Sequence, residues 1–258
     1  MNNWIADRES KLREFFNLSP DVNLIAPEIA GNFDVSATVA AHLERFNIEW
    51  HIIPSAESVP IDTDDYRARM YPALKIDHTN REFKKTDSYR AVMSGHERHQ
   101  GKIIGIETTQ KPKYLPGNRQ FYGTPYGFEP RADPFAPYLG RANFTSGTRF
   151  SHSYASLRDF VNLVTKEWKE RGLTPEGYRL TICPPVVFNF IGNVFHKEWS
   201  ETESLELGFY RDEHGNAKCY SVGSNAPGDF SYIHEVETSA DWTLLGFRTA
   251  LVPEQITN

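Results

Sequence analysis

Residues 151–182 read SHSYASLRDFVNLVTKEWKERGLTPEGYRLTI, and this stretch does most to set the fold. Its apolar side chains recur at the spacing of one face of an α-helix, namely at Leu157, Phe160, Val161, Val164 and Trp168. The hydroxyls of Ser151 and Ser153 can cap the first turn, and Gly172 is typical of a helix end. The following YRLTI predicts a strand, so a long amphipathic helix leads directly into a sheet.

Further helices and strands are predicted on both sides of this stretch. Helices are expected over 3–16 and 35–46, and strands over 48–53, 102–109 and 243–252, with a hairpin over 205–223. Pro184 and Pro185 interrupt the YRLTI strand, and VVFNFIG at 186–192 is interpreted as its continuation. Together these elements predict an α+β fold. A small helical and mixed N-terminal part, residues 1–100, would pack on a loop-rich mixed domain, residues 101–258.

Composition limits the classes of function. The chain has 258 residues, 39% of them hydrophobic and 24% charged, with a net charge of −6. The opening MNNWIADRESKLREFF carries charges where a secretory peptide needs an apolar core, and no stretch approaches the length of a membrane span. We therefore expect a soluble cytoplasmic protein without a membrane segment. The negative charge disfavours nucleic acid as a partner, and Cys183 and Cys219 are expected to be small buried thiols.

Residues 111–150, called segment 111–150 below, are rich in aromatic and cationic residues, a composition that predicts a recognition surface. They hold nine of the 34 aromatic residues, and six cations stand against Glu129 and Asp133. Rings beside guanidinium groups suit anionic, planar or sugar-like ligands, on a small molecule or on a protein. The residues expected to make contact are Arg119, Tyr122, Tyr126, Arg131 and Arg141. The alternative is an ordered loop whose rings pack onto its own domain while its arginines face water.

Two weaker patterns suggest metal chemistry. The sequence GHERH places His96 and His99 close enough to share a metal ion, although a solvated polar surface is the alternative. A metal-dependent nuclease is a second hypothesis for function. It would use Asp77 and Glu107 to hold a divalent cation, the only candidate cofactor, and Lys111 to help activate water. A subunit of a larger assembly is a third. No residue fixes a reaction, so the sequence leaves open whether the protein is an enzyme.

Four short signatures occur in order along the second half of the chain. They are Tyr178-Arg179-Leu180, Gly192-Asn193-Val194 with Trp199 behind it, Gly223-Ser224, and Gly246-Phe247-Arg248. In this order they resemble the formylglycine-generating-enzyme family, a variant of the C-type-lectin fold, over residues 100–258. The resemblance implies a loop-rich scaffold that displays a binding surface, of which segment 111–150 would be part. The family's oxidase chemistry needs two cysteines near the C-terminus to hold copper, and none follows Cys219.

Overall fold

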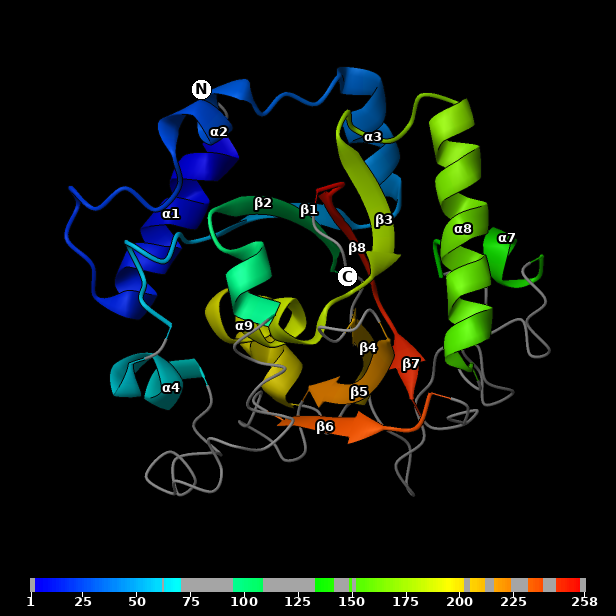
Figure 1. Cartoon of the computed structure of the whole chain (residues 1–258). Helices are drawn as coiled ribbons and strands as arrows, with labels where there is room; N and C mark the ends of the chain where they lie inside the picture. The colour runs from blue at the N-terminus through cyan, green and yellow to red at the C-terminus, as the bar shows by residue number, and fades with distance from the viewer. Residues whose placement is uncertain are drawn as a thin grey trace.

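The fold is taken from a computed structural model (Figure 1). It describes residues 3–61, 63–70, 95–108, 133–141, 149, 152–201, 205–211, 216–223, 232–238 and 245–255. The helices are α1 (Asn3–Phe16), α2 (Pro27–Asn32), α3 (Ala37–Arg45), α4 (Asp64–Met70), α7 (Ala136–Leu139), α8 (Tyr154–Glu170), α9 (Pro185–Phe195) and the 3-10 helix η4 (Lys197–Glu201). The strands are β1 (Ile48–Ile53), β2 (Lys102–Glu107), β3 (Tyr178–Ile182), β4 (Leu205–Arg211), β5 (Ala217–Gly223), β6 (Tyr232–Val236), β7 (Gly246–Phe247) and β8 (Thr249–Pro253). The predicted α+β class is confirmed.

The first sheet has the strand order β1-β2-β8-β3, and every neighbouring pair is antiparallel. Its β1 precedes residue 100 and its other three strands follow it, so both predicted parts of the chain contribute to one sheet. Helices α1 and α9 share one hydrophobic core, and α3 and α8 share another. Figure 1 shows α3 beside α8. Along β8, Ala250 and Val252 belong to the first core and Leu251 to the second. This alternation buries both faces of the sheet.

The second sheet has the order β6-β5-β4-β7, with β4 and β7 parallel and the other pairs antiparallel. The pairing of β4 with β5 confirms the predicted hairpin. Only Arg248 separates β7 from β8, so the chain passes from the second sheet to the first at that residue. The single closing strand predicted over 243–252 is therefore divided between two sheets.

The helices with clear periodicity are confirmed. The hydroxyl of Ser36 accepts from the amide of Val39 at the start of α3, and the hydroxyl of Ser153 caps α8. Gly172 follows α8 with a φ of 64°, a left-handed conformation that costs glycine little. The buried residues of α8 are Leu157, Phe160, Val164 and Trp168, all of them predicted.

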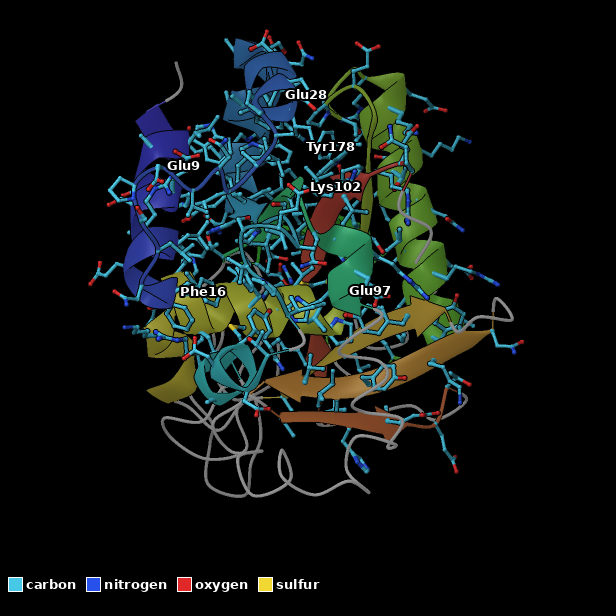
Figure 2. All side chains as sticks on the ribbon, turned by 60° about the vertical axis from the view of Figure 1, so that its left-hand side comes forward. Glu9, Phe16, Glu28, Glu97, Lys102 and Tyr178 are labelled. Carbon is cyan, nitrogen blue, oxygen red and sulfur yellow. The ribbon has the colours of Figure 1, made fainter. Side chains whose placement is uncertain are left out.

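Helix α9 corrects the strand predicted at 186–192. Nearly all of its residues are buried, so its sequence shows no alternation between an apolar and a polar face. Its first helical residue is Pro185, a position where the missing amide costs nothing. The amide of Val186 donates to the hydroxyl of Tyr210 on β4 at 2.9 Å, so a distant side chain completes the helix start. At the lower end of α1 in Figure 2, Phe16 stacks on Phe190 of α9.

The two cysteines and the helices of the described residues bear on two further predictions. Cys183 and Cys219 are both buried and free, as the sequence predicts. Among the described parts of the chain, no helix combines the length and the apolar composition needed to cross a membrane.

Candidate functional site

The base of segment 111–150 is fixed by a buried guanidinium. Arg149 donates to both carboxylate oxygens of Glu107, at 2.7 and 2.8 Å, and to both oxygens of Asp133, at 2.6 and 2.7 Å. The side chains of all three residues are at most 4% exposed. Glu107 ends β2, whereas Asp133 and Arg149 belong to segment 111–150. One residue therefore ties two points of the segment to the end of a strand.

A second guanidinium completes this buried ion network. Arg248 pairs with Glu206 of β4 at 3.0 and 3.1 Å and donates to the backbone carbonyl of Glu107 at 2.6 Å. Its guanidinium carbon lies 4.4 Å from the ring centre of Trp199, while that of Arg149 lies 5.2 Å from the ring centre of Phe135. Ion pairs and rings together satisfy two charges that would otherwise be costly to bury.

A surface cleft of about 770 Å³ opens beside this network, where residues 133–141 meet α3 and α8. Its apolar lining includes Phe46, Tyr138 and Leu173. Below it, the indole N–H of Trp168 donates to the hydroxyl of Tyr138 at 3.0 Å, and the ring centres of Phe46 and Trp168 lie 4.8 Å apart. This aromatic packing gives the cleft a firm apolar floor.

Three exposed arginines line the cleft: Arg45 at the end of α3, Arg141 after α7, and Arg171 after α8. Glu167 pairs with Arg141 and lies 3.8 Å from Arg171. The hydrogen bond with Arg141 lowers the pKa of Glu167 below its usual value. The other acid in the lining, Asp133, is already paired with Arg149 inside the protein. The cleft therefore carries more positive than negative charge, although the whole chain is acidic.

His42 lies in the wall of the same cleft. Burial lowers the pKa of its imidazole, and the nearby charges of Arg45 and Arg171 lower it further. The ring packs edge-on against Trp168 at 4.6 Å, and its Nε2 atom has no hydrogen-bond partner among the described residues. Because Nε2 is itself buried, it does not offer a hydrogen bond to a ligand in the cleft.

The predicted contact residues divide into two groups. Arg141 lies in the cleft. The other four, Arg119, Tyr122, Tyr126 and Arg131, lie outside the described residues, as do Asp77 and Lys111 of the nuclease hypothesis. Arg45, Arg171 and Glu167 were not found from the sequence, because each reads locally as an ordinary charge near a helix end.

The described rings of segment 111–150 face inward. Phe135 and Tyr138 belong to the core that α3 and α8 share, and Arg149 is also buried. Only for Arg141 does the structure show an outward cation, with a side chain 54% exposed. At Phe135 and Tyr138 the alternative interpretation is therefore confirmed, because both rings pack onto the protein's own core.

Glu107 is fully buried, so its carboxylate has no access to solvent or to a substrate. Besides Arg149, its carboxylate accepts from the hydroxyl of Thr249 at 3.0 Å and from the amide of Thr249 at 3.3 Å. A metal ion at this carboxylate would have to displace Arg149 from a fully buried position. No observation therefore favours the nuclease hypothesis over recognition.

The alternative prediction for His96 and His99, a solvated polar surface, is wrong because both rings are buried. The hydroxyl of Tyr66 lies 2.8 Å from Nε2 of His96, and His99 donates from Nδ1 to the carbonyl of Gly95 at 2.6 Å. Burial lowers the pKa of His96 to about 3 and that of His99 to about 4.

Within the described residues, the side chains that could share a metal ion are a different group. They are Glu49, His51 and His196. No local motif in the sequence joins them, because His196 follows His51 by 145 positions.

The four signatures of the formylglycine-generating-enzyme resemblance fall on different elements. Tyr178-Arg179-Leu180 opens β3, Gly192-Asn193-Val194 lies in α9 with Trp199 in η4, and Gly246-Phe247-Arg248 spans the passage between the two sheets. Of the fourth signature, Gly223 ends β5 and Ser224 lies outside the described residues. Comparison with known proteins finds no matching family, curated protein or solved structure.

Proposed function

We propose that the protein recognises an anionic ligand, or an anionic group on a partner protein, through segment 111–150. The cleft beside residues 133–141 would be the described part of the site. The observation that carries this proposal is the convergence of Arg45, Arg141 and Arg171 on one depression, where the partly buried Glu167 faces two of them, Arg141 and Arg171. These arginines come from three separate segments of the chain.

The chemistry of the cleft suits a ligand with a charged end and a flat or apolar body. Guanidinium groups can bind a carboxylate or a phosphate through two parallel hydrogen bonds. The floor at Phe46 and Tyr138 offers apolar area. A sugar acid, a nucleotide or an acidic side chain would meet these requirements.

The pair between Glu167 and Arg141 would be exchanged when the ligand binds. Exposed ion pairs contribute little to stability because water screens them. An incoming anion can therefore take the place of Glu167 beside Arg141 at low cost. Glu167 would then compete with the ligand for Arg141, and this competition would disfavour weakly charged ligands.

The buried network supports the proposal by fixing the root of the segment. Arg149 holds Asp133 near the cleft and Glu107 at the end of β2. Rigid placement of a binding surface reduces the conformational entropy lost on binding. The same network would give residues 133–141, beside the cleft, a defined position.

The experiment is a binding screen on the intact chain, with thermal stability and calorimetry as readouts. The panel contains inorganic phosphate, a dicarboxylate, a nucleotide, a sugar phosphate and an acidic peptide. The C-type-lectin-like resemblance adds an acidic oligosaccharide. A hit is expected to lose about 10-fold or more in affinity with Arg141→Ala and with Arg171→Ala, since each removes a charge-assisted hydrogen bond.

A matched control separates recognition from general charge. Arg158 is exposed on the same helix as Glu167, pairs with its neighbour Asp159, and is absent from the cleft. Arg158→Ala should leave the affinity unchanged. Equal losses in Arg141→Ala and Arg158→Ala would overturn the proposal, as would the absence of any hit from the panel. The double variant Arg119→Ala with Tyr122→Ala tests the rest of the segment in the same assay.

A further inference from the structure

A second group of polar side chains lies away from the cleft, between α1, β1 and the end of α9. Glu49 and His51 are two residues apart on β1, so they share one face of the strand. His196 follows the last residue of α9 and reaches the same place. The potential ligand atoms of these three residues all lie within 4.8 Å of one another.

The two imidazoles have nitrogen atoms without hydrogen-bond partners. His51 is completely buried, and neither of its ring nitrogens has a partner among the described residues. Nε2 of His196 also lacks one. Buried polar atoms are nearly always paired, so three such atoms beside a carboxylate need an explanation.

The distances are close to those of a metal site. Oε2 of Glu49 lies 3.8 Å from Nε2 of His51 and 3.8 Å from Nε2 of His196. In a tetrahedral zinc site with bonds of about 2.0 to 2.1 Å, the ligand atoms lie about 3.4 Å apart. Small rotations of Glu49 and His196, which are both partly exposed, would close the difference.

A second layer of contacts orients two of the three ligands. His196 donates from Nδ1 to the carboxylate of Glu198 at 2.8 Å, which leaves the lone pair of Nε2 directed at the group. A carboxylate behind a histidine is the usual support of a metal-bound imidazole. Thr108 donates to Oε1 of Glu49 at 3.1 Å, and Arg8 donates to Oε2 at 2.8 Å.

The charged side chains around this group are of both signs, so some repel a bound cation and others attract it. Arg8 contacts the carboxylate directly, and the charges of Lys11 and Arg248 also reach the two imidazoles. Against them stand the carboxylates of Glu49 and Glu198.

We infer that Glu49, His51 and His196 bind one divalent transition-metal ion of the zinc class. Two imidazoles exclude Mg²⁺ and Ca²⁺, which take oxygen ligands, and favour Zn²⁺, Co²⁺, Ni²⁺ or Cu²⁺. Three protein ligands leave the fourth tetrahedral position open. This open position is characteristic of sites that bind water or a small ligand on the metal. The inference is independent of the anion site in the cleft.

The test is metal binding by the untagged full chain after dialysis against a chelator. Titration with Zn²⁺, in competition with a chromophoric chelator, is expected to show one equivalent bound. Co²⁺ should give the visible absorption of a four-coordinate site with nitrogen and oxygen ligands. His196→Gln removes a partly exposed ligand and should abolish stoichiometric binding. Glu198→Gln removes only the supporting carboxylate and should weaken binding by about 10- to 100-fold.

The control is His99→Gln, which removes another buried imidazole whose Nε2 has no partner. This variant should bind one equivalent with unchanged affinity, and far-UV circular dichroism checks that each variant is folded. Failure of the wild type to bind one equivalent would overturn the inference. Binding that survives His196→Gln, or that is lost in His99→Gln, would place the ion elsewhere and overturn it equally.

Discussion

The guanidinium of Arg149 binds the carboxylate of Glu107 in a two-pronged pair, with hydrogen bonds of 2.7 and 2.8 Å between residues 42 positions apart. Neither side chain is more than 1% exposed. Asp133 accepts from the same guanidinium, so two carboxylates share one cation. This arrangement joins the end of β2 to both described parts of segment 111–150, and it links the fold to the proposed binding surface.

Removal of one member of this network should be costly. Glu107→Ala leaves Arg149 buried with only part of its charge balanced, and it leaves the hydroxyl of Thr249 without this acceptor. We expect the free energy of unfolding to fall by about 3 to 5 kcal/mol, as measured by urea denaturation. Glu170→Ala, at an exposed pair with Lys166, should cost less than about 1 kcal/mol. Similar losses in the two variants would contradict the structural role of Glu107.

Sequence patterns predicted those elements that carry a local signal. Helix α8 has an apolar stripe, a serine cap and a terminal glycine, and each of these signals is local. Strand β1 was predicted from its β-rich sequence and the proline that follows it, and the β4–β5 hairpin from its alternation and its turn. Helix α9 was missed, since a helix buried on every side has no polar face to reveal its period. Pro185 at its first turn is the local signal that could have identified it.

The candidate sites were harder to predict, because tertiary contacts create them. Arg141 was found since it lies in a segment of unusual composition. Arg45 and Arg171 reach the same cleft only because α3 and α8 pack side by side. His51 and His196 likewise meet only after β1 and α9 have folded together. No single stretch of sequence holds either constellation.

The start of α9 provides a test of a tertiary helix cap. Tyr210→Phe removes the hydroxyl that accepts from the amide of Val186, and it adds no volume. The amide stays buried without this partner, so unfolding should become easier by about 1 to 3 kcal/mol. Urea denaturation measures the change, and hydrogen exchange at the first turn of α9 should become faster. Unchanged exchange there would show that the hydroxyl does not support the helix start.

The contact between β4 and α9 is tight enough to exclude a methyl group. A Cβ atom at Gly208 would lie 2.9 Å from Cγ of Pro185 and 3.0 Å from the carbonyl oxygen of Cys183. Gly208→Ala should therefore cost about 1 to 3 kcal/mol through overpacking. Gly31→Ala is the paired control, because α2 leaves open space around that position and alanine suits a helix better. It should raise stability by about 0.4 to 1 kcal/mol, and a loss there would contradict the described packing.

The buried histidines near Tyr66 make stability depend on pH. Burial sets the pKa of His96 at about 3 and that of His99 at about 4, whereas an unfolded histidine titrates near 6.5. Between these values the unfolded chain binds protons that the folded chain does not. Stability should therefore be full above pH 6.5 and decline as the pH falls toward 4, by up to about 1.4 kcal/mol per pH unit for each histidine.

His99→Gln should remove one of these contributions and make the decline less steep. Urea denaturation at pH 7, 6 and 5, with a chelator present, gives the slope for wild type and variant. Comparison of slopes is needed because loss of the hydrogen bond to Gly95 lowers stability at every pH. The wild-type slope exceeds that of the variant only if the folded protein keeps His99 neutral. Parallel pH profiles for the two proteins would mean that His99 takes up protons in the folded state, and its burial would then be wrong.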